Sequence, residues 1–186
     1  MNTDMTENLL LRPPVMDDLE RFFAIHADPA TNRFNPAGPL KEREEACNRL
    51  GAWIRHWQEH GYGQWAVASR DTPEHVIGFG GISLRDYAGV ERVNLGYRFD
   101  TAAWGKGYAS ELGRAALRFA HEELQLPDVF GLVRPRHLAS IRVLEKIGMK
   151  QAGTLDDVPS AEYSLVYQSA RTWAVQKPGA APLFRE

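Results

Sequence analysis

Apolar residues along this chain follow helical spacing in some stretches and strand-like spacing in others. Between Lys41 and His60 they recur at i, i+4, i+7, i+8 and i+11 from Ala46, which places them on one face of a helix. Asp17 and Glu20 have the spacing of a capping box at the start of an earlier helix. We therefore expect helices over residues 17–27, 41–60, 110–120 and 138–147.

Strand-like patterns fill most of the remaining chain. We expect strands over residues 9–12, 64–69, 76–84, 90–99, 129–133, 149–155 and 162–167. Turn-forming residues at 71–74 and 86–89 separate three consecutive strands, which predicts an antiparallel meander. The order of elements predicts a mixed α/β (α+β) fold of about seven strands, antiparallel in its first half. It also predicts one domain, 1–186, with its core over about 9–173 and a frayed tail at 177–186.

Composition and charge narrow the class of protein. The 44% hydrophobic and 25% charged residues are ordinary for a soluble protein. A net charge of −2, with arginines scattered along the chain, does not indicate a nucleic-acid-binding surface. Cys47 is the single cysteine, so an internal disulfide is excluded and a reducing compartment fits. No apolar run reaches the ~20 residues of a membrane span, and the N-terminus lacks a signal-peptide pattern. We expect a cytoplasmic protein with no nucleic-acid or membrane partner.

Residues 104–110, Trp-Gly-Lys-Gly-Tyr-Ala-Ser, follow a predicted strand and open a predicted helix. Glycines let backbone approach a ligand closely, and the first N–H groups of a helix have no intrahelical partner. This arrangement suits a phosphate-bearing ligand. A dinucleotide motif would require glycine at Ser110, and no Walker A sequence is present. A plain glycine turn joining strand to helix is the alternative.

A second motif makes the interpretation more specific. His137-Leu-Ala-Ser140 is followed by Lys146-Ile-Gly-Met149. Together with the glycine loop, this segment resembles the GNAT superfamily of acyl-CoA N-acyltransferases. The loop matches the family's Arg/Gln-x-x-Gly-x-Gly/Ala motif with Trp104 in the first place, and His137 stands where asparagine is usual. Residues 9–13, 94–97 and 104–109 resemble the RimJ/RimL-like branch, which includes ribosomal-protein N-terminal acetyltransferases. The likeness covers roughly residues 9–173.

The resemblance implies a GNAT fold whose two central strands splay apart to admit acetyl-CoA. It implies transfer of the acetyl group from acetyl-CoA to a primary amine by direct attack in a ternary complex, without a metal. The acceptor would be a protein N-terminus or a small amine metabolite or antibiotic, and the enzyme a monomer or homodimer. A non-catalytic acyl-CoA-binding or sensing module is the alternative.

The resemblance also assigns residues to the cofactor. The implied cofactor-binding residues are Tyr97, Arg98, Phe99, Trp104, Gly105, Lys106, Gly107, Tyr108, Ala109, Ser110, His137 and Ser140. Ser140 is the candidate catalytic donor to the leaving thiolate, because Leu144 occupies a place where many members have tyrosine. Alternatively, Ser140 has only a structural role, capping its helix or filling space beside it.

The groups that would act on the amine are hypotheses from position. Glu91 begins the cofactor-facing strand and is the candidate catalytic base, with a solvated strand-end charge as the alternative. Asn94 and Tyr163 are candidate substrate-binding residues. Alternatively, Asn94 is a polar residue exposed by the alternation of its strand, and Tyr163 has a packing role. His26 is expected to be a histidine at the edge of the first helix whose ring is hydrogen-bonded, without a catalytic role.

Overall fold

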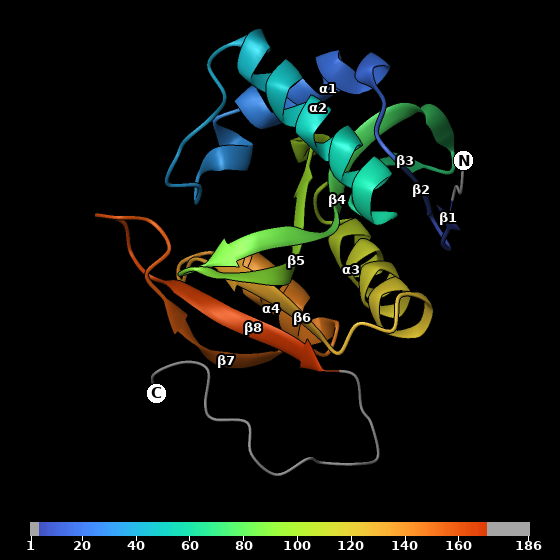
Figure 1. The fold of residues 1–186 in the computed structure, drawn as a ribbon. Coiled ribbons are helices and arrows are strands. Elements are labelled where there is room, and N and C mark those ends of the chain that lie inside the picture. The colour runs from blue at the N-terminus through green and yellow to red at the C-terminus, as the bar shows by residue number, and fades with distance from the viewer. Residues whose placement is uncertain (1–3, 171–186) are drawn as a thin grey trace.

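Within residues 4–170, which the computed structural model describes, eight strands form one continuous sheet (Figure 1). The strands are β1 (Asp4–Met5), β2 (Leu9–Arg12), β3 (Gln64–Ser69), β4 (Thr72–Tyr87), β5 (Val90–Phe99), β6 (Asp128–Val133), β7 (Lys150–Leu155) and β8 (Ser164–Ala170). The helices are α1 (Leu19–Ala27), α2 (Arg43–His60), α3 (Tyr108–Arg118) and α4 (Leu138–Lys146). Short helical turns cover Met16–Asp18, Ala30–Asn32, Thr101–Ala103 and Phe119–Glu123.

The sheet has the order β1-β2-β3-β4-β5-β6-β8-β7. Strands β1 to β5 are antiparallel throughout, which confirms the predicted meander. Strands β6, β8 and β7 are also antiparallel to one another, and β5 and β6 form the parallel pair that joins the two groups. The mixed α/β class predicted from the sequence is therefore confirmed.

Several element boundaries differ from the prediction. The two-residue β1 precedes the expected first strand and makes the sheet one strand wider. Strand β4 is longer than expected because its turn-like residues remain paired as far as Tyr87↔Val90. The turn itself uses only Ala88 and Gly89, both at positive φ (54° and 86°), which is the geometry of a two-residue hairpin loop.

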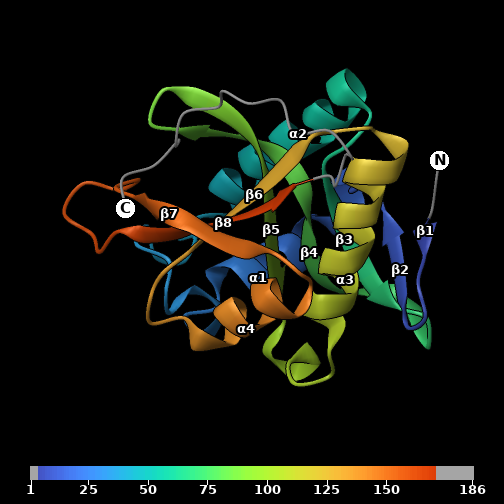
Figure 2. The same cartoon turned by 90° about the horizontal axis from the view of Figure 1, so that it is seen from below.

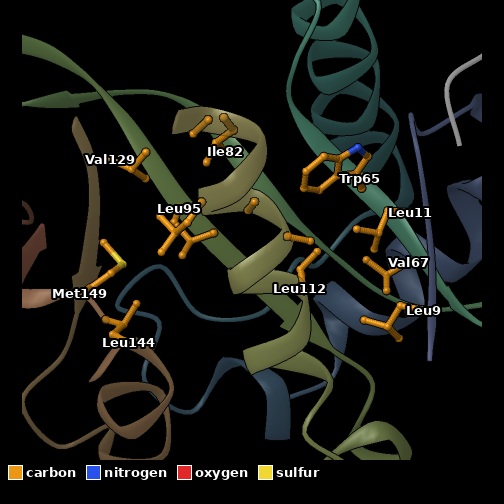
Figure 3. Close-up of a cluster of buried hydrophobic side chains, with 14 of the residues drawn as sticks. Leu9, Leu11, Trp65, Val67, Ile82, Leu95, Leu112, Val129, Leu144 and Met149 are labelled. Carbon is orange, nitrogen blue, oxygen red and sulfur yellow. The ribbon is translucent and has the colours of Figure 1, made fainter. Parts of the chain in front are cut away.

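Helices cover both faces of the sheet. Figure 2 shows α3 and α4 on one face, with α1 and α2 on the other. The larger core lies between the sheet and the α3/α4 face, and Figure 3 labels ten of its side chains. Leu9 with Leu11, and Trp65 with Val67, alternate along β2 and β3 so that each pair faces this core. A second core packs α1 and α2 against Phe79 and its neighbours on the opposite face.

Strands β5 and β6 are paired at one position only and then diverge. Asn94 is paired with Phe130, and β5 continues to Phe99 without a further partner in β6. The implied splay of two central strands is thus confirmed. The gap places Asn94 at its vertex and directs the end of β5 toward the glycine loop.

The predicted core end at 173 and the tail at 177–186 lie outside the described residues. Between residues 4 and 170, none of the helices has both the length and the apolar character needed to cross a membrane.

Candidate functional site

A cleft of about 1120 Å³ opens where β5 and β6 diverge. Its walls come from β5 from Asn94 onward, parts of β3 and β4, and the end of β6 with the residues after it. The glycine loop with the first turn of α3, the first two turns of α4, the segment after α1, and the connection between β7 and β8 complete them. Segments far apart in the sequence therefore meet around the gap in the sheet. The lining includes these predicted residues: Asn94, Tyr97, Arg98, Phe99, Trp104, Gly105, Gly107, Tyr108, Ala109, Ser110, His137 and Ser140.

The glycine loop at the cleft leaves several N–H groups without a backbone acceptor. Gly105 and Gly107 have φ of 76° and 81°, a conformation that residues with a Cβ rarely adopt. The N–H groups of Ser110 and Glu111 bond back to the Gly107 carbonyl. Among residues 4–170, however, the N–H groups of 106–109 have no backbone acceptor. A Cβ at Gly107 would meet no atom within 4 Å, so the space above the loop is open to an anion.

Trp104 anchors the loop to β5. Its Nε1 donates to the Phe99 carbonyl at 3.0 Å, while the residue remains 53% exposed. Ser110 is buried in the first turn of α3. Lys106 is exposed and is absent from the cleft lining, so only its backbone belongs to the loop that faces the ligand.

Tyr97 and Ser140 form a hydrogen-bonded pair between β5 and α4. The phenol oxygen of Tyr97 lies 2.8 Å from Ser140 Oγ, and either hydroxyl can be the donor. Burial raises the pKa of Tyr97 to about 12, against the lowering effect of the Ser140 hydrogen bond. The phenol therefore stays protonated and the pair retains a proton to donate. Leu144 lines the same wall and is 2% exposed, which gives the pair an apolar surrounding.

A row of neutral polar side chains crosses β3, β4 and β5 at the vertex of the gap. Gln64 Nε2 donates to Ser83 Oγ at 3.1 Å, and Ser83 is paired directly with Asn94 in the neighbouring strand. The Tyr87 hydroxyl donates to Asn94 Oδ1 at 2.7 Å, and burial raises the pKa of Tyr87. Tyr87 occupies one of the two acceptor positions of Oδ1, which leaves the other position and the amide N–H groups of the buried Asn94 for a ligand. The alternation of apolar and polar residues along their strands did not identify Gln64 or Ser83 as candidate site residues.

The wall after α1 is fastened to β5 and α4 by side chains. Arg98 Nη1 donates to the Thr31 carbonyl at 2.8 Å and also to Asn32 Oδ1. Phe34 stacks on His137 with ring centroids 4.3 Å apart. Burial, and then the charge of Arg98, lower the pKa of His137, which favours the neutral form of its ring. The side chains of Arg98 and His137 thus shape the cleft by holding this wall.

His26 lines the cleft from α1 and is buried between aromatic rings. Its Nδ1 donates to the Phe22 carbonyl at 2.9 Å, and its ring stacks on Phe22 at 4.0 Å. Burial, and next the charge of Arg98, lower its pKa to about 3. This agrees with the expected satisfied histidine, although the sequence did not indicate that the residue reaches the cleft.

Asp157 holds a charged cluster at the β7–β8 side of the cleft. Its carboxylate lies 3.1 Å from Arg134 and 3.3 Å from Arg85, and it accepts a 3.0 Å hydrogen bond from Ser164 Oγ. The Asp157 side chain is 7% exposed. The cluster joins β4, the residue after β6, the β7–β8 connection and β8. Because these contacts join distant parts of the chain, no local sequence pattern indicated them.

Two further predicted residues lie away from the cleft. Glu91 is exposed, is paired with Asp86, and precedes the point where the strands diverge. Burial first, and then the charge of Glu91, raise the pKa of Tyr62, the second residue after α2. Tyr163 is 45% exposed just before β8 and does not line the cleft. Over residues 4–170, no three His, Cys, Asp or Glu side chains gather as a metal site.

Comparison with known sequences assigns these features to a family. Residues 8–150 match the family described as acetyltransferase (GNAT) domain. YjcK of Bacillus subtilis (strain 168), a probable N-acetyltransferase, is 30% identical over 151 residues, which cover 81% of this chain and 77% of that protein.

Solved structures share the same architecture. A GNAT-family acetyltransferase from Bacillus anthracis is similar with a TM-score of 0.76 and 24% identity, covering 91% of this chain and 99% of that one. RimL, a ribosomal L7/L12 alpha-N-protein acetyltransferase solved in complex with coenzyme A, gives a TM-score of 0.74 and 13% identity, covering 91% and 98% of the two chains. At these identities both comparisons establish the fold.

Proposed function

Because this chain belongs to the acetyltransferase (GNAT) family, we propose that it is an N-acetyltransferase that moves an acetyl group from acetyl-CoA to a primary amine by direct attack in a ternary complex. The observation that carries the proposal is the gap between β5 and β6, which combines open N–H groups at 106–109 with the Tyr97–Ser140 pair and the polar row at Asn94. We place the activity in the cytoplasm, without a nucleic-acid or membrane partner.

The residues of the cleft fit acetyl-CoA. The N–H groups of 106–109 and the start of α3 suit a pyrophosphate. The edge of β5 beyond Asn94 has no strand partner in β6, so its backbone groups are available to the amides of pantetheine. Acetyl-CoA supplies a thioester-activated acetyl group: its C–S bond breaks as the N–C bond forms, the amine loses one proton and the thiolate gains one.

The chain's own residues position and stabilise this exchange. Tyr97 and Ser140 supply a protonated hydroxyl at the wall of the cleft, suited to hydrogen-bond a departing thiolate. A phenol of pKa about 12 is a weaker acid than an ordinary thiol, so the pair acts as a hydrogen-bond donor or relay. Holding the two substrates together provides much of the rate enhancement in such reactions.

The proposal includes the interpretation that the chain is a member of the RimJ/RimL-like branch of the family. The similarity to RimL, a ribosomal L7/L12 alpha-N-protein acetyltransferase, supports it at the level of fold. Protein N-termini and small amines are both acceptors of the kind we propose, and the enzyme would act as a monomer or homodimer.

A thiol-release assay tests the proposal. The protein is incubated with acetyl-CoA and a panel of amines, and free thiol is measured against an amine-free control. We expect amine-dependent release, together with mass-spectrometric detection of the acetylated amine. Acetyl-CoA binding without release for any amine would instead identify the chain as an acyl-CoA-binding or sensing module.

A further inference from the structure

The charged side chains that line the cleft are nearly all cationic. They are Arg33, Arg85, Arg98, Arg134, Arg136 and Asp157. The whole chain carries a net charge of −2, so this concentration of arginine is a local property of the cleft. A cationic cleft attracts anionic ligands and disfavours polycations.

Two of the five arginines are firmly engaged by the protein. Arg98 holds the wall after α1. Arg134 is 11% exposed, pairs with Asp157 and also bonds the Glu162 carbonyl. Arg136 lies 3.6 Å from the Glu162 carboxylate. Arg98 and Arg134 are therefore held by the protein. Arg136, whose side chain is 83% exposed, and the exposed Arg33, which lies over the Phe34 ring, are held only loosely.

Arg85 also has most of its donor capacity open, and unlike Arg33 and Arg136 it lies in a strand beside the polar row. Its side chain is 48% exposed, and its contact within residues 4–170 is one 3.3 Å approach of Nη2 to Asp157. Charge-assisted pairs are usually about 2.7–2.9 Å long, so this contact is a loose one. A guanidinium has five N–H donors in a planar fork that matches a carboxylate. Asp157 keeps Arg134 and Ser164 as partners if Arg85 turns toward a ligand.

Strand geometry places Arg85 next to the polar row. Arg85 and Ser83 are two residues apart in β4 and therefore share a face of the sheet. Ser83 is paired with Asn94, at the vertex of the gap. Two residues along a strand span about 6.6 Å, a length that suits one small molecule between the vertex and Arg85.

We propose that the acceptor is a small, amino-acid-like amine whose carboxylate pairs with Arg85 while its amino group lies beside Ser83 and Asn94. This inference rests on the proposed acetyl transfer and names its substrate class. The surrounding cations also favour the neutral, nucleophilic form of the amine, because like charges disfavour an ammonium. A diamine would bring a second positive charge into the same field and is disfavoured.

The test uses matched acceptors at saturating acetyl-CoA. Free α-amino acids are each compared with the α-carboxamide that has the same side chain, and with a diamine of similar length. We expect kcat/KM for the best amino acid to exceed that of its amide by about tenfold or more, as loss of a charged hydrogen-bonded pair produces. The diamine should be the poorest acceptor.

Substitutions identify the residue responsible. Arg85→Gln should raise the KM for the amino acid about tenfold, leave its amide within twofold, and leave the KM for acetyl-CoA unchanged. Arg85→Lys should restore part of the preference. Arg70→Gln is the matched control, because Arg70 bonds the Thr6 and Glu7 carbonyls away from the cleft.

The outcomes separate this inference from the proposed function. Thiol release with the amide or the diamine equal to or above that with the amino acid overturns the inference and leaves acetyl transfer in place. An Arg85→Gln effect that is equal for acid and amide also overturns it. Absence of release with every amine overturns the proposed function, and the acceptor class with it.

Discussion

The Tyr97 phenol oxygen and Ser140 Oγ lie 2.8 Å apart and connect β5 to α4 across the wall of the cleft. Neither hydroxyl ionises near neutral pH, because burial raises the pKa of Tyr97 to about 12 and serine is a weaker acid still. The pair is therefore suited to present a proton, and its members should behave as one unit in mutagenesis.

Ser140→Ala should lower kcat by about tenfold or more, while changing the KM for either substrate less. Tyr97→Phe should have an effect of similar size, and the double variant should be little worse than the more impaired single one. Ser169→Ala and Tyr167→Phe are matched controls, since both have side-chain hydrogen bonds outside the cleft. An unchanged kcat in Ser140→Ala would show that the serine is structural.

Gly107→Asp should abolish acetyl-CoA binding measured by calorimetry, because a carboxylate would occupy the open space where an anion meets the N–H groups. The matched control is Gly89→Asp. Gly89 has φ of 86° against 81° at Gly107, and a Cβ at either glycine meets nothing within 4 Å. Each substitution should lower stability by about 1–2 kcal/mol through left-handed backbone strain. Equal acetyl-CoA affinity in the two variants would contradict the assignment of the loop.

Glu91→Gln tests the base inferred from the sequence. A general base at this position would make kcat/KM fall most at low pH, where little free amine is present. The exposed position of Glu91, before the strands diverge, leads us to expect the parental pH–rate profile. Glu74→Gln, at another exposed strand carboxylate, is the control. A selective loss at low pH would restore Glu91 as the base.

His26 should make the fold sensitive to acid. Its pKa is about 3 in the folded protein and about 6.5 when unfolded, so the unfolded state binds more protons between these values. Stability is therefore present above pH 6.5 and decreases as pH falls toward 3, by up to about 1.4 kcal/mol per pH unit. In denaturant melts, His26→Gln should flatten this slope, whereas His75→Gln, at an exposed histidine, should not. Parallel slopes in all three proteins would refute the prediction.

The sequence predicted elements where one local pattern decides the structure. The amphipathic repeat of α2, the meander and the glycine loop were all readable because a few neighbouring residues determine them. The ends of β4 were predicted too short because Asp71 to Glu74 look like a turn, although pairing with β3 retains Thr72 onward in the strand. The two residues of β1 are too few to form a pattern.

The cleft was less predictable because its contacts join distant segments. The side chains of Arg85 and Asp157 are 72 residues apart in sequence and meet only after β4 and the β7–β8 connection are in place. Glu91 was assigned from its strand alone, but whether a strand residue reaches the cleft depends on where β6 departs from β5. That point is set by pairing between strands, which alternation within one strand does not reveal.

The single backbone bridge between Asn94 and Phe130 also has a consequence for how the molecule unfolds. It divides the hydrogen-bonded sheet into a five-stranded and a three-stranded block, so the joint between them has the fewest backbone cross-links. Tyr87 packs on Phe130 across this joint, as does the guanidinium of Arg92 at 4.6 Å from the ring centroid. A ligand lying in the gap would contact both blocks, and its binding energy would strengthen the connection between them.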